Sequence, residues 1–214
     1  MAKGEMRLRS VNIGTATPFK ETSARVTGIF KMPVPEALVT AKGVAGDAVC
    51  DRKHHGGRDQ AIYVYGQPDY DWWSKELGRP LDPGTFGENL TIDGLSSAEI
   101  HIGDRFEIGD VVLEVTSPRI PCRTFAARMD DKMFVKSFLA ARRPGVYARV
   151  LGEGTVRPGD SITHIPFAGE QVLAVEMTET WNRRDLPAET IARYLATPIH
   201  HKERERWAKK LSTP

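Results

Sequence analysis

The sequence predicts a mainly β fold with a few helices, followed by a small C-terminal bundle of three helices. Two observations support this prediction. From Val11 to about Pro166, Gly, Pro and Asp recur at short intervals, which is typical of many short strands joined by tight turns. After about Ala168 glycines become rare and helix-forming residues predominate. We therefore expect one domain over residues 1–168 and a second over residues 169–214.

Alternation of apolar and polar residues indicates the strands. Residues 26–30 and 61–65 each form one strand-like run. In residues 104–118, apolar side chains alternate with polar ones on both sides of a Gly-Asp turn, which predicts a hairpin. Residues 145–150 and 159–165, with a Gly-Glu-Gly turn between them, predict a second strand pair.

Helical spacing occurs at two places within the β region. Residues 69–77 have a proline just before them and a glycine just after, and these bound a helix. We expect one ring of the Trp72-Trp73 pair to be buried and the other to be half exposed. Residues 131–140 place their apolar side chains at helical intervals.

The C-terminal region is expected to hold three short helices, at roughly residues 172–182, 187–196 and 200–211. We expect this tail to lie against the β domain as a small bundle. Its buried side chains would be Leu186, Ile191, Leu195 and Trp207.

The composition is that of an ordinary globular protein. Of the 214 residues, 40% are hydrophobic and 27% are charged. With 30 basic and 28 acidic residues, charge alone does not favour binding to a nucleic acid polymer. No apolar run approaches the length of a membrane-spanning helix, and the first residues lack the pattern of a signal peptide. We expect a cytoplasmic protein without membrane contact.

The chain has two cysteines, Cys50 and Cys122, which cannot form a disulfide framework or supply four thiolates to an iron–sulfur cluster. Cys122 follows two prolines that stiffen residues 117–123, so its position is defined. Arg119 and Arg123 flank it and favour the thiolate. The alternative is a buried structural cysteine. For Cys50 we expect the simpler role of filling a gap in the core.

A second candidate is the loop at residues 53–60, which contains Gly56 and Gly57. Adjacent glycines let backbone N–H groups point at an anion, and Lys53 and Arg58 add positive charge beside them. The alternative is a tight surface turn with incidental charges.

Three further features of the loops bear on the site. Because neighbouring side chains of an extended segment point in opposite directions, at most one of His54 and His55 faces a site. Asn89, in the turn at residues 86–90, offers both a donor and an acceptor. Residues 142–145 form either an anion-binding turn or a solvated basic turn.

Taken in order, residues 43–65, 86–95, 102–122 and 145–162 resemble the MOSC domain, the C-terminal domain of molybdenum-cofactor sulfurases. The resemblance covers roughly residues 20–165. The tail is similar to the small 3-alpha domain that follows MOSC in one bacterial subgroup. The ordered set of motifs is more specific than any single one of them.

The resemblance implies a β-barrel of mixed strands with a cleft for the molybdenum cofactor, a molybdopterin that holds the metal. It implies an oxidoreductase that reduces N-hydroxylated small molecules, including hydroxylaminopurine-type bases. The family's cysteine, the expected molybdenum ligand, falls on Cys122. Because the chain shows no iron–sulfur, flavin or haem motif, electrons would come from a separate donor protein.

The resemblance also implies particular site residues. The family's His-Gly-Gly, Phe-Gly-Glu-Asn and Ser-Pro-Arg elements fall on residues 55–57, 86–89 and 117–119. The expected catalytic residues are Cys122, His55 and Asp59. The expected cofactor-binding residues are His55, Gly56, Gly57, Asn89, Arg119 and Arg123. Lys53, His54 and Arg142 match no fixed element of the family.

Two other functions fit the same residues. The domain could carry the cofactor, or a sulfur atom as a persulfide of Cys122, to another enzyme without catalysis. It could also be a thiol hydrolase built from Cys122, His55 and either Asp59 or Asn89. No nucleophile signature surrounds Cys122, which counts against the hydrolase.

Overall fold

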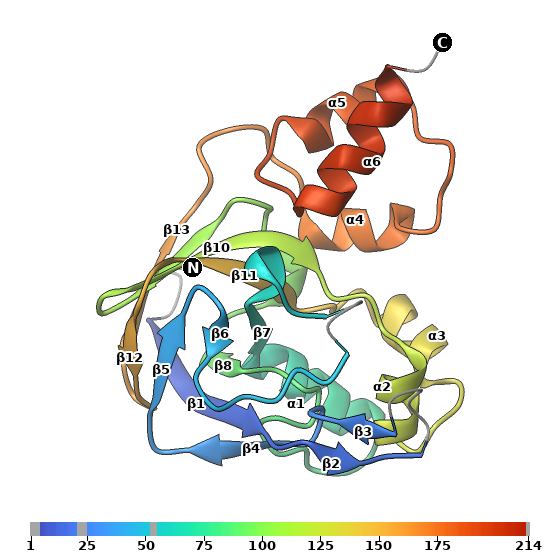
Figure 1. The fold of residues 1–214 in the computed structure, drawn as a ribbon. Coiled ribbons are helices and arrows are strands. Elements are labelled where there is room, and N and C mark those ends of the chain that lie inside the picture. Colours follow the sequence, from blue (N-terminus) through green and yellow to red (C-terminus); the bar gives the residue numbers. More distant parts are fainter. Residues whose placement is uncertain (1–4, 21–24, 52–54, 213–214) are drawn as a thin grey trace.

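The computed structural model describes residues 5–20, 25–51 and 55–212. Its main sheet has the strand order β13-β9-β10-β11-β7-β8-β1-β4, and β13 also pairs with β1. The second pairing closes seven strands into a barrel, and β4 lies beside β1 outside that ring (Figure 1). The strands are β1 (Met6–Gly14), β4 (Lys31–Val34), β7 (Ile62–Gly66), β8 (Leu90–Asp93), β9 (Arg105–Ile108), β10 (Val111–Pro118), β11 (Val146–Gly152) and β13 (Ser161–Ile165).

The barrel is mixed, as expected, because β7 and β8 are parallel while the other paired strands of this sheet are antiparallel. Short strands form two small additional sheets: β2 (Thr17–Pro18) with β3 (Val26–Thr27), and β12 (Gly154–Val156) with β5 (Ala37–Thr40) and β6 (Gly43–Val44). The helical elements are η1 (Arg58–Gln60), α1 (Gln67–Glu76), η2 (Ser97–Glu99), α2 (Arg123–Arg128), α3 (Phe134–Ala141), α4 (Ala174–Thr180), α5 (Ala188–Leu195) and α6 (His201–Leu211).

The structure confirms the predicted hairpin but not the predicted pairing of strands farther apart in the chain. The hairpin at residues 104–118 is confirmed, with Val111 opposite Ile108. The second strand pair is wrong, because barrel closure gives β11 the partners β10 and β7 and gives β13 the partners β9 and β1. The strand expected at residues 26–30 is only the short β3. Strand β1 and helix α2 had not been predicted.

The core has two parts. Apolar side chains fill the barrel, and a second cluster of aromatic side chains packs between the barrel and helices α1, α2 and α3. In that cluster Trp73 is 1% exposed, whereas Trp72 is only partly buried, as the sequence predicted. The cluster includes Phe125 of α2 and therefore anchors the helix that begins directly after Cys122.

The tail packs on the barrel. Helix α4 contacts β10, and α5 contacts α6 (Figure 1). Leu186, Ile191 and Trp207 are buried and belong to the same apolar cluster as the barrel interior, and Leu195 packs against that cluster. The prediction that the tail lies against the barrel is therefore confirmed. Within the described ranges, no helix is long and apolar enough to cross a membrane.

Candidate functional site

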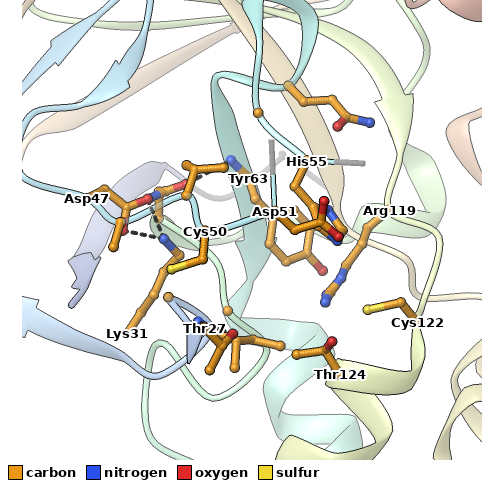
Figure 2. A pocket seen from close by; sticks show the side chains of 18 of the residues that line it. Thr27, Lys31, Asp47, Cys50, Asp51, His55, Tyr63, Arg119, Cys122 and Thr124 are labelled. Atoms are coloured by element: carbon orange, nitrogen blue, oxygen red, sulfur yellow. Dashed lines mark hydrogen bonds and ion pairs between the residues drawn. The ribbon is translucent and has the colours of Figure 1, made fainter. Parts of the chain in front are cut away.

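A cavity of about 730 Å³ opens beside the barrel and brings together the main sequence-predicted residues. His55, Gly56, Asn89, Arg119, Cys122 and Arg123 all line it. Figure 2 shows Cys122 and Arg119 on one side, with Lys31 and Asp47 opposite them. Cys50, which was expected to fill a core gap, instead lines the same cavity and is half-buried.

Cys122 lies at the junction between the loop that follows β10 and helix α2, where it is the residue before the first helical turn. Its thiol is hydrogen-bonded by His55, and the backbone N–H of Phe125 also points at it. Burial raises the pKa of Cys122, but the His55 hydrogen bond, the positive charge of Arg119 and this N–H outweigh burial and lower the pKa to about 6. The thiol is therefore mainly a thiolate at neutral pH.

Arg119 provides a fixed positive charge next to that thiolate. The residue is 4% exposed, and its guanidinium lies 4.0 Å from the centre of the Phe125 ring and 5.1 Å from that of Tyr63. One amino group donates to the backbone oxygen of Phe86 at 3.1 Å. Its Nε is buried and has no hydrogen-bond partner among the described residues. Arg119 also lines the cavity, so its positive charge is available to a bound anion.

The opposite wall is a buried ionic network that no local pattern in the sequence indicates. Lys31 and Asp47 form an ion pair with side chains 8% and 7% exposed. Asn89 donates to Asp47 Oδ2 at 2.9 Å, and its Oδ1 accepts the N–H of Tyr63 at 3.2 Å. The amide nitrogen also donates to the backbone oxygen of Asn12 at 3.4 Å, so the side chain of Asn89 is fully engaged by the protein and we assign it to shaping the wall. Burial lowers the pKa of Lys31, against the opposing effect of Asp47.

The glycine loop contributes to the cavity only in part. Gly56 lines it with φ of 75°, and a Cβ there would come within 3.0 Å of Val49. Gly57, although it also has a positive φ, is exposed at the start of η1 and is not among the residues that line the cavity. Lys53 and His54 lie outside the described residues.

Asp59 does not reach the cavity. The turn η1 places Gln60 at the Cys122 cavity and Asp59 at a second pocket, of about 550 Å³, beneath the tail. There Asp59 accepts hydrogen bonds from the backbone N–H and the Nδ1 of His201, both at 2.8 Å, and pairs with Arg149 at 3.0 Å. The expected catalytic role of Asp59 beside His55 has no geometric basis, because consecutive residues of the tight turn face opposite sides.

The basic turn at residues 142–145 is not among the residues that line the cavity. Arg142 pairs with Glu179 of α4. Arg143 donates to Asp69 at 2.7 Å and lies over the Trp72 ring. These arginines connect the turn to its neighbours, and neither lines the Cys122 cavity.

Comparison with known proteins is consistent with this fold. The family described as "MOSC domain" matches residues 51–163, which include both the His55 loop and Cys122. This chain belongs to the MOSC domain family.

Three similar proteins illustrate the breadth of the MOSC match. YflK of Bacillus subtilis (strain 168) is 34% identical over 178 residues, covering 82% of this chain and 80% of YflK. The crystal structure of YiiM from Geobacillus stearothermophilus superimposes with a TM-score of 0.79 and 26% identity, covering 97% of this chain and all of YiiM. A protein named "Reductase" from Gibberella moniliformis is 34% identical over 143 residues, which are 64% of this chain but 25% of that protein.

The chemistry of the site in this MOSC protein favours one class of ligand. A thiolate, a buried guanidinium and a buried ion pair of Lys31 with Asp47 surround one cavity. Soft sulfur ligands favour transition metals, and cations favour an anionic organic group. Cys122 could hold a metal, and Arg119 with the Gly56 loop could bind the anionic part of a cofactor.

Proposed function

We propose that this MOSC protein binds a molybdenum cofactor and reduces N-hydroxylated small molecules such as hydroxylaminopurine-type bases. The observation that carries this proposal is the Cys122 thiol, which lines the cavity and is held as a thiolate by His55 and Arg119. The name of the Gibberella relative supports reductase chemistry in a protein that shares part of this sequence.

The residues present fit such a cofactor. A thiolate is the soft donor that molybdenum prefers among protein side chains. The positive charges of Arg119 and Arg123, which both line the cavity, favour a negatively charged pterin and its phosphate. Cys122 would hold the metal. Arg119, Arg123 and the backbone at Gly56 would contact the organic part.

When bound, the cofactor supplies the two-electron chemistry that removes an oxygen atom from the N-hydroxyl group. The chain supplies the surroundings. An imidazole nitrogen of His55 can hold or release a proton next to the cavity, as a general acid–base group does. The Tyr63 and Tyr147 side chains line the walls of the same cavity.

The electrons are proposed to come from a separate protein. Two cysteines cannot bind a four-thiolate iron–sulfur cluster, and one of them is the proposed metal ligand. The protein would therefore depend on a redox partner that reaches the cavity or its rim.

The proposal is tested by metal analysis of protein produced in a host that synthesises the cofactor. We expect about one molybdenum per chain in the wild type, since one thiolate ligates one metal. We expect loss of both molybdenum and hydroxylaminopurine reduction in Cys122→Ala. Cys50→Ala is the matched control, because it removes the other thiol of the same cavity. Protein without molybdenum, together with unchanged reduction by Cys122→Ala, would contradict the proposal.

A carrier function is the second candidate, and the low pKa of Cys122 favours it because a thiolate can take the outer sulfur atom from the persulfide of a donor protein, whose own thiolate then leaves. Mass spectrometry that finds a stable sulfur adduct on Cys122, with no turnover under any electron donor, would support it. The thiol hydrolase loses support, because Asp59 faces another pocket and the amide of Asn89 is engaged by Asp47 and Tyr63.

A further inference from the structure

We infer that the C-terminal tail positions the Cys122 site, with Asp59 as the positioning residue. The start of helix α6 holds both the turn that follows the His55 loop and the strand that leads to Cys122. This role goes beyond the proposed function, and it does not depend on which cofactor the cavity binds.

We call the contacts of tail residues 200–201 with η1 and β10 the clamp. Its first half is the Asp59 carboxylate, which is 4% exposed. One oxygen accepts both hydrogen bonds from His201, each at 2.8 Å. The other oxygen lies 3.0 Å from Nε of Arg149 on β11. A buried carboxylate with these partners has a well-defined position, and it ties η1 to the tail and to the barrel at once.

The second half of the clamp is Thr116, near the end of β10. The backbone N–H of His200 donates to the backbone oxygen of Thr116 at 3.0 Å. The hydroxyl of Thr116 donates to the backbone oxygen of Asp59. The strand then runs directly into the loop that carries Arg119 and Cys122. The tail residues 200–201 therefore connect η1 to β10.

The two elements that the clamp holds, η1 and β10, adjoin the two loops that carry His55 and Cys122. His55 lies just before η1, and Cys122 lies just after β10. The hydrogen bond between them joins two loops whose relative position depends on the clamp. The turn η1 is also a shared wall, because Gln60 lines the Cys122 cavity while Arg58 and Asp59 line the pocket under the tail. A displacement of η1 therefore changes the shape of both the Cys122 cavity and the pocket under the tail.

A cation site at the same place is less consistent with the surroundings. Asp59, His200 and His201 can offer ligand atoms within 4.8 Å of one another. Arg149 and Arg204 also line that pocket, and their charges oppose a metal ion. The carboxylate is already hydrogen-bonded and paired. The cluster is better described as a clamp.

The inference is tested on the full chain, prepared without cofactor, by the rate at which iodoacetamide alkylates Cys122 at neutral pH. Peptide mass spectrometry separates the Cys122 signal from that of Cys50. We expect His201→Ala and Asp59→Asn to slow the reaction by about fivefold or more, because a displaced η1 weakens the His55 hydrogen bond that makes the Cys122 thiol reactive. We expect His201→Asn, which retains a side-chain donor, to restore much of the rate.

The matched control is Arg193→Ala, which removes the tail's ion pairs with Glu170 and Glu176 without touching η1. It should leave the alkylation rate unchanged. His201→Ala keeps its backbone donor and its half-exposed position, so the variant is expected to fold, and circular dichroism checks this. A wild-type rate in both clamp variants would overturn the inference. Equal slowing by Arg193→Ala would also overturn it, because the effect would then come from general loosening of the tail.

Discussion

At the scale of single residues, the site is defined by the contrast between the two cysteines. Both line the same cavity and both are half-buried. Among the described residues, Cys122 has a hydrogen bond from an imidazole, a neighbouring guanidinium and the N–H of Phe125, which together outweigh burial and favour the thiolate. The chemistry thus depends on what surrounds the sulfur, and exposure alone does not distinguish the two thiols.

This contrast gives a pH dependence. In cofactor-free protein, the alkylation rate of Cys122 should rise with pH, pass its midpoint near the pKa of about 6 and level off above it, because the thiolate is the nucleophile. His55→Ala should move the midpoint upward, since it removes the largest interaction that favours the thiolate. Rates measured by mass spectrometry across the pH range would check this. A midpoint that is the same in both proteins would show that His55 does not stabilise the thiolate.

At the scale of elements, the cavity wall depends on how the turn before β11 packs on β7. Gly145 in this turn has φ of 63°. A Cβ there would lie 2.5 Å from Cδ2 of Tyr65, 2.7 Å from the oxygen of Val64 and 2.8 Å from Cε2 of Tyr63. Tyr63 in turn lines the cavity. The close approach of two strands therefore requires a glycine at this position.

We predict that Gly145→Ala lowers the free energy of unfolding by more than about 1 kcal/mol, because steric overlap adds to the strain of a positive φ. Gly159→Ala is the matched control: its φ is also positive, at 96°, but a Cβ there would meet nothing within 4 Å. Both substitutions add the strain of a positive φ, but only Gly145→Ala adds steric overlap. The difference between the two variants in the free energy of unfolding, measured with urea, therefore reports the overlap. A Gly145→Ala variant no less stable than Gly159→Ala would contradict this account of the wall.

At the scale of the whole molecule, the tail and the barrel share one apolar core and one buried polar junction. Val172, Met177 and Trp207 belong to the cluster that fills the barrel. His200 is 7% exposed at the junction, and its Nδ1 accepts the backbone N–H of Lys202. Burial and the neighbouring His201 lower the pKa of His200 to about 4. The junction is therefore built around a neutral imidazole.

This arrangement predicts an acid-sensitive molecule. Between the ordinary pKa of histidine, 6.5, and the folded value of about 4, the unfolded chain binds a proton at His200 that the folded chain does not. The free energy of unfolding should therefore fall as pH falls, by about 2–3 kcal/mol from this group. His200→Asn keeps an acceptor for Lys202 and should flatten that part of the profile. Identical profiles from chemical unfolding across this range would refute the assignment.

The tertiary structure explains why some site residues were predicted and others were not. Cys122, Arg119 and Arg123 lie close together in the chain, so local chemistry indicated a reactive thiol, and the structure places all three at one cavity. Lys31 and Asp47 had no such local signal, since their pairing with Asn89 joins distant segments. These roles at the cavity remain predictions for the experiments above.

Local patterns in the sequence predicted the mainly β character, the hairpin at residues 104–118 and the helical tail, because period-two and helical patterns are local properties. The strand pairing that closes the barrel and the direction in which Asp59 points could be found only from the folded structure. Both depend on contacts between segments far apart in the chain. No local pattern encodes such contacts, because they form only when the whole core is packed.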